Sequence, residues 1–401
     1  MACLLVFTFM TMFLISFSAN DVVGESLFPA MFVFGDSLVD AGNNNYLNSL
    51  AKANFEPYGI DFSEGPTGRF SNGKTPIDIL GEKVGLPYLP AFVDTVPQSN
   101  NIFSGVNYAS AAAGILDESG RTLIMLIGPL EFTTWDCDIL TYPCNFLQIL
   151  CTTFNNEHKI TQGERISFNQ QVRNFETTLS QLNEQMDNST LSQYLAKSLT
   201  VLNHGSNDYI NNYLLPELYL TRFIYSPSNY AELLVRIYKV HILDLHGLGL
   251  RKFLLAGIGP LGCIPNQLSR RFIQPGECVV YVNNLVSMFN DALKTMVDQL
   301  NMEYHDSTFV YVNAYEIIAD VIDNPDSYGF SVTDRACCGL GRNQGQLSCL
   351  PMSIPCTDRI EYVFWDAFHP TEAVNNILVS KAFTGPPSIS YPINVKQMAE
   401  V

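Results

Sequence analysis

The stretch FVFGDSLVDAGNN, at residues 32–44, decides the fold prediction because it joins a strand signal to a reactive side chain. Its first three residues form a short apolar run that is typical of a buried parallel strand. Ser37 follows closely, with Gly35 before it and helix-compatible residues from Leu38 onward. A strand that turns into such residues presents the serine hydroxyl as a nucleophile.

Four further β-rich runs alternate with amphipathic stretches along the chain. The β-rich runs lie at residues 106–108, 199–202, 253–256 and 309–312. Apolar residues at three- and four-residue spacing from Phe168 to Met186, and again from Leu285 to Leu300, predict helices with one apolar face. Strands separated by helices favour a parallel sheet covered by helices on both sides. The prediction is an α/β fold with a parallel sheet of about five strands and ligands beyond their carboxyl ends.

A catalytic serine needs a histidine held by an acid, because its hydroxyl is a weak nucleophile until a base removes the proton. The segment WDAFHP, at residues 365–370, offers both as Asp366 and His369. One loop can present the pair, with Asp366 orienting His369. Taken singly these residues are ordinary, since a serine after a strand is more often a helix cap. The prediction of a catalytic site depends on their combination.

Negative charge that develops on a substrate oxygen needs preorganised hydrogen-bond donors. Asn207, at the end of the third predicted strand, offers a side-chain amide. The backbone N–H groups of Ser37 and of the Ala111 region complete the predicted oxyanion hole. On its own, the pair Asn207-Asp208 is more often a turn.

Four sequence blocks, in this order, resemble the plant-type GDSL esterase/lipases of the SGNH hydrolase superfamily. The blocks are FGDSLVDAGNN at 34–44, NYASAAAG at 107–114, GSNDY at 205–209 and DAFHP at 366–370. The resemblance implies a three-layer α/β/α, flavodoxin-like fold. It also implies a catalytic triad of Ser37, His369 and Asp366, and an oxyanion hole formed by Ser37, Ala111 and Asn207. It implies no metal and no cofactor.

Two residues depart from the pattern of that family. Ala111 stands where the broader family carries an oxyanion glycine, but a backbone N–H donor survives this change. His204 stands where the family usually has an aliphatic residue. A histidine three positions from Asn207 is either a core residue paired to the backbone or a disturbance of the oxyanion hole, and we favour the core interpretation.

The single hydrolase domain predicted over residues 27–385 contains an atypical insertion at residues 122–162. Family members resemble this chain up to Arg121 and resume at Gly163, normally with only a couple of residues between them. A long loop without its own periodicity is unusual inside a compact domain. We hypothesise a translated intron or an unusual splice form. Sequencing of the mature transcript tests this, since a dominant form that includes the segment would make it a lid candidate.

The amino terminus predicts entry into the secretory pathway and an extracellular location. Residues 4–17 form an uncharged apolar run that ends in small residues, which is typical of a signal peptide, here residues 1–19. The run is short for a membrane span and lacks flanking positive charge, which disfavours a signal anchor. We expect no membrane segment after removal of this peptide. Asn188 begins a glycosylation acceptor, and residues 386–401 are expected to be a loose tail.

The ten cysteines are interpreted as disulfide material in a secreted chain. One lies in the signal peptide and three lie in the insertion, which leaves six that can pair with open connectivity. Their spacing fits no standard zinc site. The pattern GIGPLG at residues 257–262 matches the dinucleotide-binding spacing, but its proline predicts an irregular loop instead of the required helix.

Composition narrows the class of function. Among 401 residues, 47% are hydrophobic and 15% charged, which indicates a well-packed globule, and we expect a monomer. The net charge of -17 repels phosphate backbones and disfavours nucleic acid as a partner. The leading hypothesis is a secreted hydrolase of small or lipid-like esters. The alternatives are an acyltransferase that uses the same acyl-enzyme and a non-catalytic secreted binding protein that keeps the fold.

Overall fold

The computed structural model describes residues 26–95, 102–123, 161–270, 274 and 276–401. A six-stranded sheet with the order β10-β7-β6-β5-β1-β2 forms its centre. The strands are β1 (Met31–Gly35), β2 (Gly105–Asn107), β5 (Leu199–Asn203), β6 (Lys252–Ala256), β7 (Thr308–Val312) and β10 (Ser390–Tyr391). The first five are parallel and follow the flavodoxin-like order 2-1-3-4-5, which confirms the predicted fold class.

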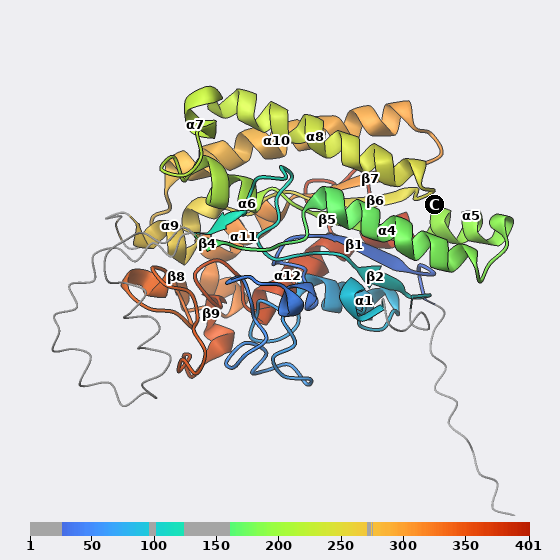
Figure 1. Ribbon diagram of the computed structural model, residues 1–401. Coiled ribbons are helices and arrows are strands. Elements are labelled where there is room, and N and C mark those ends of the chain that lie inside the picture. The colour runs from blue at the N-terminus through green and yellow to red at the C-terminus, as the bar shows by residue number, and fades with distance from the viewer. Residues whose placement is uncertain (1–25, 96–101, 124–160, 271–273, 275) are drawn as a thin grey trace, which may run out of the picture.

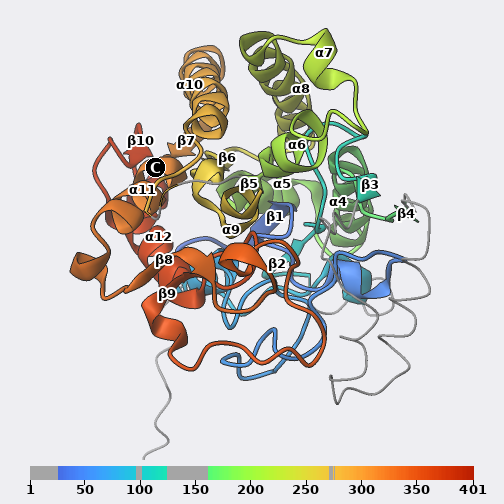
Figure 2. The same ribbon diagram turned by 90° about the vertical axis from the view of Figure 1, so that its left-hand side faces the viewer.

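Helices cover both faces of the sheet, so the molecule has three layers (Figures 1 and 2). One face carries α4 (Phe168–Asn183), α5 (Asn188–Lys197), α8 (Pro227–Gly247) and α10 (Val280–Glu303). The other face carries α1 (Pro76–Val84), α11 (Ala314–Asp323), α12 (Glu372–Thr384) and α13 (Val395–Met398). The two predicted amphipathic stretches correspond to α4 and α10. All five residues of β1 are buried, because helices cover both faces of the sheet. This burial explains why the strand is apolar along its length.

Shorter elements connect these layers and surround the carboxyl ends of the strands. The short helices are η1 (Asn43–Tyr46), α2 (Phe92–Thr95), α6 (Ser206–Asp208), η4 (Tyr209–Tyr213), α7 (Thr221–Ile224), η5 (Leu261–Cys263), α9 (Pro265–Ser269), η6 (Pro325–Tyr328), η7 (Arg342–Gln344) and η8 (Arg359–Glu361). The short strands are β3 (Thr122–Leu123), β4 (Thr161–Gln162), β8 (Val332–Ala336) and β9 (Tyr362–Phe364).

The carboxyl-terminal residues 386–401 are packed, so the expectation of a loose tail is wrong. They add β10 antiparallel to β7 at the edge of the sheet and then form α13. Val395 and Met398 are fully buried, and the Lys252 ammonium donates to the backbone carbonyl of Met398 at 3.0 Å. A two-residue strand and a one-turn helix have no periodicity that a sequence pattern could show.

The predicted insertion leaves and re-enters the domain at one place. Its first and last residues form the antiparallel pair β3 and β4, and the Gly163 N–H donates to the Arg121 carbonyl at 3.1 Å. Residues 124–160 and the predicted signal peptide lie outside the described residues. The hypothesis about the origin of the insertion stays a prediction.

Three disulfides join the six cysteines whose pairing the spacing left open. They are Cys263–Cys278, Cys337–Cys356 and Cys338–Cys349. The first closes the loop that follows β6, where the glycine-rich pattern at 257–262 leads into the short η5 and not into a long helix. Each link removes loop entropy from the unfolded chain.

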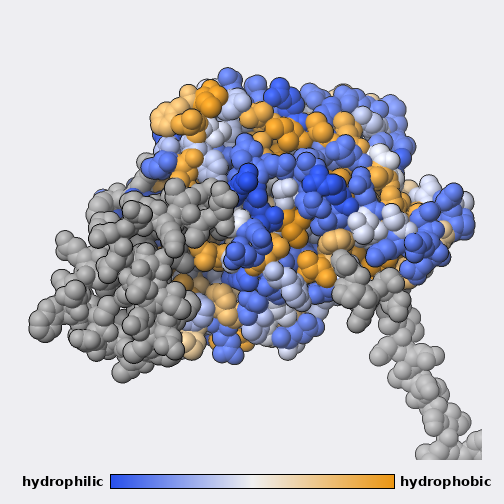
Figure 3. All heavy atoms as spheres, viewed as in Figure 1, coloured by the Kyte–Doolittle hydropathy of each residue, from blue (hydrophilic) through white to orange (hydrophobic). Residues whose placement is uncertain are grey.

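Among the described residues, no helix has both the length and the apolar character needed to cross a membrane. The same part of the chain shows no group of three or more His, Cys, Asp or Glu side chains placed to hold a metal ion. Most of the surface in Figure 3 is hydrophilic or mixed, with an apolar cluster around α7 at the upper left. Leu220, Phe223 and Ile224 form this cluster and are 68%, 74% and 66% exposed.

Candidate active site

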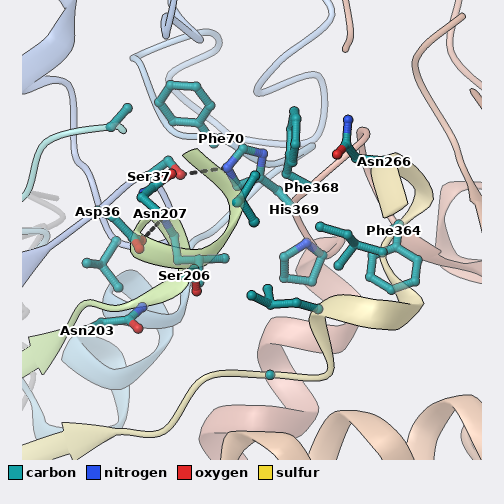
Figure 4. A pocket seen from close by; sticks show the side chains of 18 of the residues that line it. Asp36, Ser37, Phe70, Asn203, Ser206, Asn207, Asn266, Phe364, Phe368 and His369 are labelled. Atoms are coloured by element: carbon teal, nitrogen blue, oxygen red, sulfur yellow. Dashed lines mark hydrogen bonds between the residues drawn. The ribbon is translucent and has the colours of Figure 1, made fainter. Parts of the chain in front are cut away.

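Ser37, His369 and Asp366 lie in one hydrogen-bonded chain at the carboxyl end of the sheet. Figure 4 shows its first link, from Ser37 to His369. Ser37 follows β1, whereas the other two residues lie in the loop after β9. The Nε2 atom of His369 is 2.7 Å from the Ser37 Oγ, and its Nδ1 atom is 2.8 Å from both Asp366 carboxylate oxygens. The fold thus brings together residues that are 332 positions apart in sequence.

The three-residue step from Asp366 to His369 has a local structural reason. The Oδ1 atom of Asp366 accepts the backbone N–H of Phe368 at 2.8 Å and of His369 at 2.9 Å, so the carboxylate caps its own turn. The Trp365 N–H donates to the His369 carbonyl at 2.8 Å, and this hydrogen bond joins the two ends of the loop. The same carboxylate can then reach the imidazole ring, which an unconstrained loop would leave free to rotate.

Tyr58 is a positioning residue that sequence reasoning missed. Its buried hydroxyl donates to the Asp366 Oδ2 at 2.5 Å. Burial opposes ionisation of Asp366, but the His369 charge and the hydrogen bonds from His369, Tyr58 and Phe368 outweigh it and lower the pKa of this carboxyl. Asp366 therefore stays ionised beside the imidazole. The long loop that carries Tyr58 offered no periodic signal, and only its aromatic residue type hinted at a buried hydrogen bond.

The predicted oxyanion donors need one correction. The N–H of Ala111 donates to the Asp40 Oδ2 at 3.1 Å, so it does not fit the role assigned to it. The N–H of Ala112, the next residue, has no acceptor in the described part of the chain. Ala112 also has a φ of 67°, the left-handed region that favours glycine. Ala112 lines the cavity, so its N–H is the better candidate for the donor that the sequence assigned to Ala111.

The other two predicted donors, Ser37 and Asn207, both line the cavity. The N–H of Ser37 has no acceptor among the described residues. The Nδ2 atom of Asn207 donates to the Ala113 carbonyl at 3.0 Å, which leaves its second hydrogen for a ligand. Asn211 donates to the Asn207 Oδ1 at 2.6 Å and fixes the orientation of the amide. Figure 4 shows Asn207 beside Ser37.

Two buried aspartates hold the loops that form this site. Asp40 accepts the backbone N–H groups of Gly42 and Asn43, both at 2.8 Å. Asp208 accepts those of Ile115 at 2.7 Å and Leu116 at 3.0 Å. Burial raises the pKa of each carboxyl to about 6, although the backbone hydrogen bonds oppose this effect. Both residues belong to the family-like blocks, and their role in the structure is to tie loops together.

His204 is a core residue, which is the interpretation that we favoured from the sequence, but its ring makes no hydrogen bond to the backbone of the described residues. Its ring stacks on Phe168 with centroids 4.2 Å apart, and its side chain is 1% exposed in total. Neither ring nitrogen has a hydrogen-bond partner in the described part of the chain. Burial lowers its pKa to about 3, with a smaller contribution from His241, so the ring is neutral near pH 7.

Replacing His204 by leucine is expected to stabilise the protein, and more so at acid pH. Below pH 6.5 the unfolded chain binds a proton at this position that the folded chain rejects until about pH 3. As the pH falls below 6.5, the free energy of unfolding of wild type therefore decreases, relative to that of His204→Leu, by up to about 1.4 kcal/mol per pH unit. Melting temperatures of both proteins from pH 7.5 to pH 5 measure this gap. His305→Leu, at an exposed position, is the control, and a gap for His204→Leu that does not change with pH contradicts the prediction.

A cavity of about 850 Å³ opens at Ser37 and His369, whereas Asp366 is fully buried and does not line it. Ser37, His369 and Asn207 all line it, together with many apolar side chains, among them Phe70 and Phe368 (Figure 4). This size and character are typical of sites that enclose a small organic ligand. The sequence predicted Ser37, His369 and Asn207 as site residues, but it did not show the cavity that they line.

Known proteins match this chain along almost its whole length. The family model described as GDSL-like Lipase/Acylhydrolase matches residues 31–382. The chain is similar to three Arabidopsis thaliana proteins named GDSL esterase/lipase. At5g08460 is 47% identical over 397 residues, which cover 98% of this chain and 93% of the relative. At1g71250 is 50% identical over 377 residues, with 94% and 90% covered, and GDSL esterase/lipase 7 is 45% identical over 380 residues, with 94% and 93% covered.

Proposed function

This chain belongs to the GDSL-like lipase/acylhydrolase family, and from that premise we propose that it is a secreted hydrolase that cleaves carboxylic esters through Ser37, His369 and Asp366. The observation that carries the proposal is the hydrogen-bonded chain from the Ser37 hydroxyl through the His369 ring to the Asp366 carboxylate. The base His369 lies within hydrogen-bond reach of both the nucleophile and the orienting acid, and Ser37 and His369 line a cavity that can hold a substrate.

Acylation follows from this geometry. As the Ser37 Oγ attacks the acyl carbon, its proton passes to the Nε2 atom of His369, which lies 2.7 Å away. Asp366 holds the opposite side of the ring and stabilises the imidazolium. When the tetrahedral intermediate collapses, His369 gives the proton to the leaving alcohol, and the acyl group stays on Ser37.

The oxyanion of that intermediate would be stabilised by three donors. The backbone N–H groups of Ser37 and Ala112 and the free hydrogen of the Asn207 amide supply them. These donors are held by the surrounding hydrogen bonds before substrate binds, so they need little reorganisation in the transition state.

Deacylation repeats the proton transfer with water as the nucleophile. His369 takes a proton from the water as its oxygen attacks the acyl carbon, and then returns that proton to the Ser37 Oγ as the acid leaves. An acyltransferase would use another hydroxyl compound at this step. The same residues serve both reactions, so the two functions differ only in the acceptor that reaches the acyl-enzyme.

Several features support secretion. The apolar run at residues 4–17 has the character of a signal peptide, and three disulfides join cysteines in a way that suits an oxidising compartment. Asn188, the first residue of α5, is exposed, as a glycosylation acceptor must be.

A fluorophosphonate probe tests the proposed nucleophile directly. The expected result is a single covalent adduct on Ser37, identified by peptide mass spectrometry, because the activated Oγ displaces fluoride from phosphorus. His369→Ala should lose most of the labelling, whereas His305→Ala, at an exposed position, should keep it. No adduct on the folded wild-type protein, or an adduct on another serine, would rule out the mechanism and favour the non-catalytic binding protein.

A further inference from the structure

The cavity lined by Ser37 and His369 continues beneath the central sheet. Its wall includes Val201 of β5, Leu254 of β6 and Val312 of β7, which all point to the face covered by α1 and α12. Ile77 and Leu80 of α1 form the opposite side. The space therefore extends from the Ser37 hydroxyl at the carboxyl ends of the strands into the layer between sheet and helices.

This space is unusual for a protein core. Val201 and Leu254 lie in the middle of their strands and Val312 ends β7, yet they keep 5%, 5% and 4% exposure. Leu202 and Phe253, on the other face of the sheet, are fully buried. Protein interiors are normally close-packed, with few voids larger than a water molecule. An empty apolar space that opens on a nucleophile is a binding space, because folding alone gives no reason to leave it unfilled.

The positions of the lining residues on α12 show how deep the space is. This helix begins three residues after His369 and runs away from the site, and the residues that line the cavity on it are Asn375, Leu378, Val379 and Ala382. From Asn375 to Ala382 the helix axis rises by about 10 Å. Every lining residue on α12 beyond Asn375 is apolar. A narrow ligand with no polar groups at its far end fits this wall.

We propose that this space is a channel for the acyl chain, and that the preferred substrates are esters of long-chain fatty acids. The inference rests on the proposed function and concerns the same site. The acyl carbon must reach Ser37, and the chain attached to it then lies along α12. Polar side chains such as Asn207 and Asn266 stand near the triad (Figure 4), where the polar ester group and the alcohol would lie.

A channel of this kind makes the specificity constant rise with chain length. Each methylene transferred from water into apolar surroundings contributes a factor of about four to kcat/KM, as long as the channel has room for it. A series of p-nitrophenyl esters from acetate to dodecanoate, kept below micelle formation, measures this dependence with one constant leaving group. The channel predicts a continued rise from butyrate to dodecanoate.

Ala382→Phe tests the deep end of the channel. The added ring would occupy space that the far end of a long chain needs, so the dodecanoate-to-butyrate ratio of kcat/KM should fall by roughly tenfold or more, equivalent to the loss of about two buried methylenes. Ser380→Phe, on the exposed side of the same helix, is the matched control and should leave the ratio unchanged. A ratio that Ala382→Phe does not change would overturn the proposal.

Two measurements separate this outcome from misfolding and from a failure of the proposed function. A ring that enters a real void leaves the melting temperature near that of wild type, whereas overpacking of a filled core lowers it. If Ala382→Phe does not fold, Leu378→Phe narrows the channel nearer the site. Calorimetric titration of dodecanoate and butyrate into Ser37→Ala tests the channel without catalysis. Tighter binding of dodecanoate, abolished by Ala382→Phe, supports the channel even in an inactive protein, and equal binding of the two acids contradicts it.

Discussion

Ser37→Ala is expected to lower kcat for ester hydrolysis by roughly a hundred-thousandfold or more, while the variant protein still folds. The substitution removes the oxygen that forms the acyl-enzyme, and no other group in the triad can take its place. What remains is the smaller effect of the oxyanion donors on direct attack by water. Only one side-chain hydrogen bond, to the His369 Nε2, is lost from the folded state, so the melting temperature should change little.

Initial rates with p-nitrophenyl butyrate, measured side by side for secreted wild type and Ser37→Ala, test this prediction. Ser380→Ala, on the exposed face of α12, controls for the loss of a serine hydroxyl and should match wild type. Equal activity of Ser37→Ala and wild type would overturn the triad assignment. Silence of both proteins, with normal melting curves, would favour an acyltransferase that needs another acceptor.

Substitution of His369 or of Asp366 is also expected to lower kcat strongly, but by different factors. His369→Ala removes the base and should lower kcat nearly as much as Ser37→Ala, whereas Asp366→Asn should lower it by about ten-thousandfold. The asparagine oxygen can still accept the Phe368 and His369 N–H groups that shape the loop. It loses the negative charge and can offer an N–H to the ring, which favours the wrong tautomer of His369.

The comparison requires kcat for both variants at saturating p-nitrophenyl butyrate and the same pH. Unfolding curves should accompany it, because Asp366 is fully buried and its carboxylate also accepts the Tyr58 hydroxyl. Wild-type activity of Asp366→Asn would show that the carboxylate does not act through His369. A greater loss in Asp366→Asn than in His369→Ala, at equal stability, would also contradict the assigned roles.

Much of the architecture was predictable because its signals are local. The parallel strands are covered on both faces, so most of their residues are apolar, as the segment at 253–256 shows. The helices α4 and α10 repeat apolar residues at the spacing of one helix face. Ser37 could be proposed for a related reason, since a polar residue that closely follows a parallel strand lies at the edge of the sheet where ligands bind.

Other parts were hidden because they depend on contacts between distant segments. The strand β10 has two residues and forms because β7 presents an open edge to it. Ala111 was a reasonable oxyanion donor in the sequence, but the Asp40 carboxylate takes its N–H in the folded chain. The pairing of six cysteines was likewise open until the backbone placed their sulfur atoms together.

The amino-acid sequence by itself determined the class of the fold and was enough to propose the three triad residues, because strand and helix periodicity and the order of residue types can be observed along the chain. Only the tertiary structure decided that Tyr58 donates to Asp366, that Asp40 accepts the N–H of Ala111, and that an apolar space runs beneath the sheet to Ala382. These features are distances and unfilled volumes between side chains from separate elements. Packing creates them, and no single segment of the sequence contains both of the surfaces that define them.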